Sequence, residues 1–427
     1  MKPKLHEDAY PEGGIGCNNP ALMKAQRSAV VELVKKLSKN LLTGNLDLLK
    51  VSLPVRIFEP RSYLEKLSDA WVYPRYLDAA SACPDPVRRL KLVTTYFVAG
   101  FHRALQVWRK PFNPILGETW QASLPDGSRI FMEQISHHPP VSAYQIYGAG
   151  GAYLFNGTSE PSVSYRGSAM TTRSKGSRCV RFPDGGEVAV CYPTYELRGL
   201  IGTGVAHGDV SGTARFEDAA HGLTVTLRFG ALDPATVGDD PLLARRRARA
   251  LPRGEEPAHA TAGAAPRRAP FLRRAKGEVA KRAALPAELI PRLKADNSTS
   301  TYLTGKAMRG LALMRGSLSA ASAASSASDA DRAAATAAVP IAACTGNWLA
   351  FLDWDGERFW TLDRDRPGAW DPDPGALPSD CRYRQDLVDL IAGDFSTAQA
   401  TKERMEHEQR HDAKLRKAGR KALLGED

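Results

Sequence analysis

The sequence predicts an α+β protein that is mostly β, with one large antiparallel sheet, twisted or nearly closed, and helices toward both ends of the chain. In the middle of the chain apolar residues recur with a period of two, as in half-buried strands, whereas toward both ends they recur at helical spacing. The chain has 427 residues, of which 43% are hydrophobic and 25% charged. This composition is typical of a globular chain and excludes collagen-like, coiled-coil and wholly disordered proteins.

Three helices are expected before the sheet. Over Ala21–Leu42 apolar residues lie at helical spacing with lysines between them, which indicates an amphipathic helix. Helical patterns follow over Tyr63–Trp71 and Pro86–Trp108. Proline suits the first position of the last helix, because the N–H that it lacks would have no partner there. Between the first two helices, Val51–Phe58 has the character of a short strand.

Strands are expected next. Two hairpins are predicted around turns rich in Pro, Asp and Gly: Thr119–Leu124 with Arg129–Gln134, and Cys179–Phe182 with Glu187–Cys191. The clearest strand is Leu223–Phe229, in which every second residue is apolar. Many short antiparallel strands in series favour one large sheet, and a closed sheet of many strands can enclose a ligand cavity.

Residues 236–340 lose this pattern and are expected to form a long disordered insertion, with one helix or strand near Tyr302–Leu313. Between Asp239 and Lys294 there are 14 Lys and Arg against 6 Asp and Glu, so eight of the eleven net positive charges of the chain lie there. The rest of the chain is nearly neutral. A general nucleic-acid-binding surface is therefore disfavoured, although this stretch could touch anionic lipid or RNA.

After the insertion, strand character returns at Asn347–Leu352 and Arg358–Leu362, with a turn at Asp355–Gly356. A short helix is expected over Tyr383–Leu390, and a strongly charged helix over Ser396–Leu424.

Several classes of protein are disfavoured by what the sequence lacks. No apolar run approaches the roughly 20 residues of a transmembrane helix, and the first residues lack the apolar core of a signal peptide, so a cytosolic protein is expected. The six cysteines lie far apart without a C-x-x-C pair, which indicates reduced thiols and neither a zinc site nor a redox motif. Complete nucleotide-binding glycine loops and the G-x-S-x-G motif of serine hydrolases are absent as well.

The sharpest local feature is a pair of adjacent histidines, His137 and His138, followed by Pro139 and Pro140. Neighbouring side chains on a strand point to opposite faces, so these two converge only if the chain bends, which the prolines favour. Three roles remain open from the residues alone: two side chains that fill a turn, a site for an anion, or a catalytic or metal-binding role.

Two further features involve charged residues. Lys110 lies in a proline-rich connection between a helix and a strand, where it offers a positive charge or simply forms part of the connection. Lys402, Glu406 and Arg410 lie four residues apart, so they share one face of a helix. An exposed salt-bridge ladder is the simplest interpretation of that spacing.

Together these features resemble one family, the oxysterol-binding protein-related lipid-transfer proteins. The segment EQISHHPP (Glu133–Pro140) matches the family signature, and KPFNPILGE (Lys110–Glu118) is similar to its second hallmark at the usual distance upstream. The segment Leu42–Glu65 is similar to the part that follows the family's N-terminal lid. LPSDCRYRQDLVDLIAGDF and KERMEHEQR are similar to its C-terminal end, so the resemblance spans roughly Lys39 to Arg416.

The resemblance implies a near-closed antiparallel β-barrel around an apolar lipid tunnel, with an N-terminal lid and flanking helices. The implied divisions are a lid and amphipathic helix (1–40), the first part of the barrel (41–235), the insertion (236–340), and the last strands and C-terminal helices (341–427). The chain resembles the short members that consist of the ligand-binding domain alone. The family's phosphoinositide headgroup contacts correspond to Lys110, Asn113, His137, His138, Lys402, Glu406 and Arg410.

The function implied is the exchange of phosphatidylinositol 4-phosphate for a second lipid, a sterol or phosphatidylserine, between membranes. The resemblance implies no catalytic residue, metal or cofactor, and it implies a cytoplasmic protein that meets anionic membrane surfaces peripherally, with no nucleic acid partner. The alternative is a lipid sensor or scaffold that binds the same lipids without transferring them. An enzyme that acts on lipid phosphate through the histidines is a third hypothesis.

Overall fold

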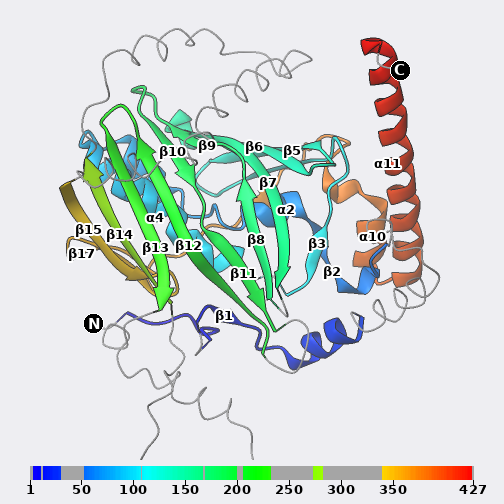
Figure 1. Ribbon diagram of the computed structural model, residues 1–427, viewed down its shortest axis with the longest axis horizontal. Helices are drawn as coiled ribbons and strands as arrows, with labels where there is room; N and C mark the ends of the chain where they lie inside the picture. The colour runs from blue at the N-terminus through cyan, green and yellow to red at the C-terminus, as the bar shows by residue number, and fades with distance from the viewer. Residues whose placement is uncertain are drawn as a thin grey trace, which may run out of the picture.

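The computed structural model describes residues 3–10, 13–29, 52–106, 108–166, 169–199, 205–231, 273–281 and 339–425. Most strands of the described chain belong to one sheet, which forms a near-closed ring (Figure 1). This confirms the predicted α+β class with a large antiparallel sheet. Within the described ranges, no helix is both long enough and apolar enough to span a bilayer.

The sheet contains sixteen strands of the described chain: β1 (Ile15–Gly16), β4 (Thr119–Ser123), β5 (Arg129–Ser136), β6 (Val141–Tyr147), β7 (Leu154–Arg166), β8 (Ala169–Lys175), β9 (Arg178–Arg181), β10 (Glu187–Cys191), β11 (Thr194–Arg198), β12 (His207–Asp218), β13 (Leu223–Ala231), β14 (Arg273–Lys281), β15 (Val339–Asn347), β16 (Phe351–Trp354), β17 (Glu357–Thr361) and β18 (Asp371–Pro372). The order is β17-β16-β15-β14-β13-β12-β10-β9-β7-β6-β5-β4-β18. Three strands lie off this path: β8 pairs with β7 and β11, β11 also pairs with β12, and β1 pairs with β12. Short β2 (Phe58–Ser62) and β3 (Lys110–Phe112) pair separately and in parallel.

The helical elements of the described chain flank this sheet. They are η2 (Val55–Ile57), α2 (Tyr63–Ser68), α3 (Arg75–Ser81), α4 (Pro86–Ala104), η3 (Ala149–Gly151), η7 (Cys381–Tyr383), α10 (Gln385–Ile391) and α11 (Phe395–Leu424). Residues 20–29 are also helical, which confirms the start of the first predicted helix; its remainder lies outside the described residues. The predicted C-terminal helices correspond to α10 and α11.

Helix α4 forms the centre of the core. Asp85 caps its first turn by accepting hydrogen bonds from two backbone N–H groups, and Pro86 occupies the first turn as predicted. Its apolar face is fully buried and packs against β12, β13, β16 and β17. Gly100 is required by this packing, because a Cβ there would lie 1.8 Å from the carbonyl oxygen of Ala70.

The strand predictions based on alternation are confirmed. Both predicted hairpins form, as β4 with β5 and β9 with β10. In β13 the side chains of Leu223, Val225, Leu227 and Phe229 are all buried, as their alternation predicts. The turn at Asp355–Gly356 joins β16 to β17, and both residues have positive φ angles.

The prediction that residues 236–340 form only a disordered insertion is wrong for β14. This strand pairs with β13 along its whole length and with β15 on its other side, so it is a central strand of the sheet. Its sequence, RRAKGEVAK, has no run of apolar residues, and its position is set by backbone hydrogen bonds to two neighbours. The helix or strand expected near Tyr302–Leu313 lies outside the described residues.

Two other local predictions need correction. The strand expected over Asn347–Leu352 is interrupted by a turn, because the Asn347 side chain accepts a hydrogen bond from the backbone N–H of Leu349 at 2.9 Å. The apolar residues of this turn are buried in the core, so their hydrophobicity reflects burial and not strand structure. The strand-like segment Val51–Phe58 contains η2, and β2 begins only at its last residue.

Candidate anion-binding site

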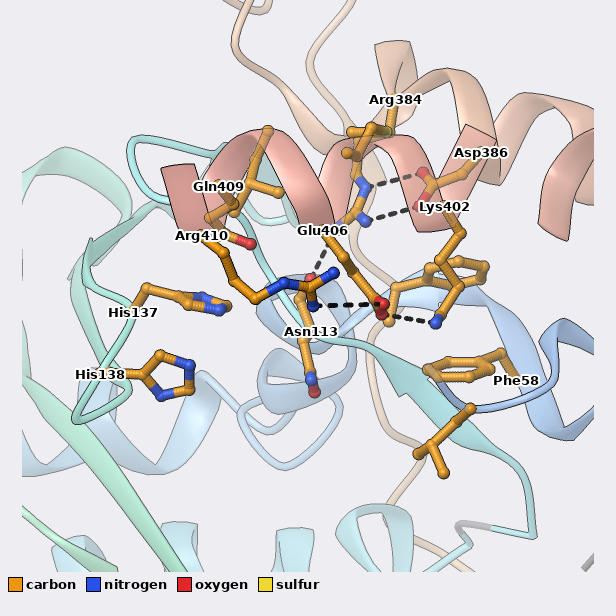
Figure 2. Close-up of a pocket in the computed structure, with 14 residues that line it drawn as sticks. Phe58, Asn113, His137, His138, Arg384, Asp386, Lys402, Glu406, Gln409 and Arg410 are labelled. Atoms are coloured by element: carbon orange, nitrogen blue, oxygen red, sulfur yellow. Dashed lines mark hydrogen bonds and ion pairs between the residues drawn. The ribbon is translucent and has the colours of Figure 1, made fainter. Parts of the chain in front are cut away.

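A pocket lies where α11, the connection from β3 to β4 and the turn after β5 meet (Figure 2). Its cavity volume is about 160 Å³, more than ten times what one water molecule needs. It is lined by Leu53, Phe58, Phe112, Asn113, Ile115, His137, His138, Arg384, Asp386, Lys402, Met405, Glu406, Gln409 and Arg410. The structure therefore brings six of the seven expected site residues to one cavity, and the seventh, Lys110, borders it.

Helix α11 presents three charged side chains to the pocket. Lys402 Nζ donates a hydrogen bond to Glu406 Oε1 at 2.5 Å, and Arg410 Nη1 lies 4.0 Å from Glu406 Oε2. The Lys402 side chain is only 5% exposed, whereas that of Arg410 is 43% exposed. One carboxylate is thus shared by two cations, so this face of the helix keeps a net positive charge.

Lys110 approaches the pocket from β3. Its Nζ donates to Asn113 Oδ1 at 2.5 Å and to the Pro111 carbonyl oxygen at 3.2 Å, and both acceptors are neutral. The ammonium groups of Lys110 and Lys402 lie 4.9 Å and 5.1 Å from the centre of the Phe58 ring. Burial, together with the positive charge of Lys402, lowers the pKa of Lys110 to about 8.

The two histidines lie on the turn that follows β5. Their ring centroids are 4.4 Å apart, and both rings face the pocket beside Arg410 (Figure 2). His137 Nδ1 lies 3.3 Å from the Pro114 carbonyl oxygen, to which it donates in the tautomer protonated at Nδ1. Burial, and the neighbouring His138, lower the pKa of His137. The geometry therefore combines a contact that holds the turn with a ring edge that remains available to a ligand.

Arg384 is the principal pocket residue that sequence reasoning missed. Its guanidinium donates to Glu118 Oε2 at 2.8 Å, to Asp386 Oδ2 at 2.9 Å and to the Asn113 carbonyl oxygen at 2.8 Å. Glu118 also accepts a short hydrogen bond from Ser62. These groups are buried, so Arg384 ties the connection after β3 to the start of α10 and holds the pocket wall in place.

The other lining residues missed from the sequence are mostly apolar: Leu53, Phe58, Phe112, Ile115 and Met405, together with the polar Gln409. No motif distinguishes them from ordinary core residues. They form an apolar wall that raises the strength of the charge interactions at the pocket.

The charges define what this pocket can bind. Arg384 is neutralised by two carboxylates, but Lys110 hydrogen-bonds neutral acceptors, and Lys402 and Arg410 share a single carboxylate. Positive charge is therefore in excess around a polar, partly enclosed space. Such a site suits a ligand that carries several negative charges together with hydroxyl groups.

The chain is similar in sequence to known lipid-binding proteins. The family model described as oxysterol-binding protein matches residues 34–235. Oxysterol-binding protein 9 of Dictyostelium discoideum is 36% identical over 208 residues, which are 48% of this chain and 48% of that protein. Oxysterol-binding protein-related protein 8 of Homo sapiens is 28% identical over 230 residues, 52% of this chain but only 25% of that protein. The chain thus aligns with half or less of these relatives.

Solved structures share the fold. The structure titled as the Osh3 ORD of Saccharomyces cerevisiae in complex with PI(4)P has a TM-score of 0.55 and 17% identity, with 98% of this chain and 89% of that chain covered. The Osh1 ORD domain in complex with ergosterol has a TM-score of 0.56 and 18% identity, with 98% and 84% covered. At this identity the likeness concerns the fold alone.

Proposed function

We propose that this chain is a lipid-transfer protein of the oxysterol-binding protein family, whose model matches residues 34–235, and that it exchanges phosphatidylinositol 4-phosphate for a second lipid between membranes. The phosphorylated headgroup occupies the pocket, and the protein shields the lipid chains from water, each buried CH₂ contributing about 0.8 kcal/mol. The second lipid is a sterol or phosphatidylserine. Extraction and delivery break no covalent bond, so the function is not enzymatic. The protein acts on cytoplasmic membrane surfaces as a peripheral protein.

The observation that carries this proposal is the convergence of cations and hydrogen-bonding groups from three distant segments on one pocket (Figure 2). Lys110, Lys402 and Arg410 pair with phosphate oxygens, whereas Asn113 and Glu406 bind ring hydroxyls. A phosphate beside His137 favours the protonated form of that imidazole, and the ring of His138 supplies a further N–H donor in the complex. This assignment gives every expected site residue a partner on the headgroup.

The solved relatives support both kinds of cargo. By its title, the Osh3 structure contains PI(4)P, and two Osh1 structures contain cholesterol and ergosterol. A sterol and a pair of acyl chains are shielded by the same types of apolar side chain. Mass spectrometry of lipids that purify with the protein therefore identifies the second cargo directly.

The test of exchange is transfer between two populations of liposomes, one of which contains phosphatidylinositol 4-phosphate. Arg410→Gln should slow transfer at least about tenfold, because it removes a charge-assisted contact worth roughly 1.5 to 3 kcal/mol. The matched control is Arg404→Gln, which removes an arginine of the same helix that pairs with Glu408 at 2.8 Å and lies outside the pocket. Saturable binding without transfer would reject exchange and favour the sensor or scaffold; release of phosphate would favour an enzyme.

A further inference from the structure

The face of α11 that lines the pocket continues beyond it as a row of lysines. Lys414, Lys417 and Lys421 follow Arg410 at intervals of four, three and four residues, so they lie on the same side of the helix. These three lysines are called the basic stripe below. The stripe therefore extends the positive side of the pocket along the helix axis.

This part of α11 has no partner within the protein as described. Residues 411–424 are all exposed and extend the helix by about 21 Å at 1.5 Å per residue. The end of α11 stands clear of the sheet in Figure 1. The earlier turns of α11 carry ion pairs such as Lys402–Glu406, but within the described residues no ion pair involves the basic stripe.

The positive charge of the stripe is also not neutralised by acidic residues of the same part of the helix. Asp412 is the one acidic residue in 411–424, and at 100° per residue it lies on the side opposite the stripe. Like charges three or four residues apart repel and destabilise a helix. The stripe consequently costs the isolated protein stability, and the charge it presents is available to an external anion.

The position of the stripe favours an extended anionic surface over a single small ligand. Three ammonium groups along about 10 Å of helix match a sheet of charged headgroups. The stripe is also continuous with the pocket, and the charge of Arg416, in the same segment, is near enough to contribute to the lowered pKa of His137.

We propose that the basic stripe is a docking element that lays the end of α11 along an anionic bilayer and so presents the pocket to lipid headgroups. The benefit to extraction rests on the function proposed for the pocket, but docking itself requires only lipid charge.

The test uses the full chain and sedimentation with vesicles of equal parts phosphatidylcholine and phosphatidylglycerol, which contain no proposed cargo. The variant is Lys414→Gln, Lys417→Gln, Lys421→Gln. The matched control, Arg173→Gln, Lys175→Gln, Arg404→Gln, removes the same charge from exposed sites away from the stripe. At roughly fivefold per basic residue at the surface, the stripe variant should bind the vesicles at least about tenfold more weakly, and the control less than about twofold.

A second measurement separates docking from headgroup binding. Affinity for soluble short-chain phosphatidylinositol 4-phosphate should stay within about twofold in the stripe variant, because the stripe lies outside the pocket. Equal vesicle binding by the stripe variant and the control would overturn the proposal. An equally large loss of affinity for the soluble lipid in the stripe variant would overturn it as well. If the unmodified chain binds vesicles through the stripe but not the soluble lipid, the proposed function fails while the docking element stands.

Discussion

Lys110 should make headgroup affinity depend on pH at mildly alkaline values. Its pKa is lowered from 10.5 to about 8 by burial and by the charge of Lys402. A bound phosphate favours the charged ammonium, so the pKa of Lys110 is higher in the complex than in the free protein. Affinity is therefore full below the free pKa and falls as pH rises through it, until the pKa of the complex is reached.

The expected change in headgroup affinity follows from the fraction of Lys110 that carries a proton. One unit above its pKa only about a tenth of the side chain is protonated, so affinity should fall about tenfold between roughly pH 7 and pH 9. A phosphomonoester loses its second proton near about pH 6, and the pKa of His137 lies below its ordinary value in the free protein.

Calorimetric titration with soluble short-chain phosphatidylinositol 4-phosphate measures this dependence. Lys110→Arg is the matched control, since a guanidinium remains charged throughout the range and should bind without the alkaline loss. Lys110→Met should bind weakly at every pH. Constant affinity of the unmodified protein over this range, or an alkaline loss that persists in Lys110→Met, would refute the reasoning.

Three further predictions concern the histidines, the buried arginine and the insertion. The double change His137→Ala, His138→Ala should weaken phosphatidylinositol 4-phosphate binding at least about tenfold, with only a small drop in melting temperature from the lost contact of His137 with Pro114. An equal loss of affinity for both lipids with a large drop in melting temperature would instead mean that the histidines only shape the turn. Arg384→Met should reduce the free energy of unfolding by about 3 to 5 kcal/mol in urea titrations, because it leaves buried carboxylates unpaired; a loss under about 1 kcal/mol would show that the network is not important for folding. Deleting 239–270 should preserve folding and binding of soluble ligand, whereas deleting 239–294 removes β14 and should abolish both; circular dichroism and the same titration distinguish the two, and equal behaviour would contradict a structural role for β14.

The sequence predicts those parts of the fold in which local pattern and tertiary position agree. The alternation of apolar and polar residues predicts β13 correctly, because one face of Leu223–Phe229 packs against the core. The same criterion misses the central strand Arg273–Lys281, whose sequence is largely polar. Backbone pairing with a strand on each side determines the position of this segment, and its side-chain pattern does not reveal it. The criterion also fails at Trp348–Ala350, where apolar residues are buried in a turn that Asn347 stabilises.

The site was predictable only where a residue belongs to a motif. His137 and His138 are conspicuous as a pair before two prolines, and the spacing of the α11 residues places them on one helical face. Arg384 carries no such signal, because its partner Glu118 lies 266 positions away and only folding brings them together. The same holds for Phe58, whose ring centre lies 4.9 Å and 5.1 Å from two ammonium groups, one from β3 and one from α11.

The contrast between Arg384 and Lys110 explains why the motif residues, and not every cation of the pocket, are the candidates for ligand binding. Arg384 makes charge-assisted hydrogen bonds to two carboxylates and a carbonyl, so a ligand phosphate would have to compete with interactions that are already made. Among the described residues, Lys110 donates to neutral oxygens only, and its lowered pKa indicates an environment that poorly compensates a charged ammonium. An arriving phosphate supplies that compensation. The binding free energy of the headgroup should therefore depend on cations that the fold leaves under-compensated, while the fully paired arginine keeps them in position.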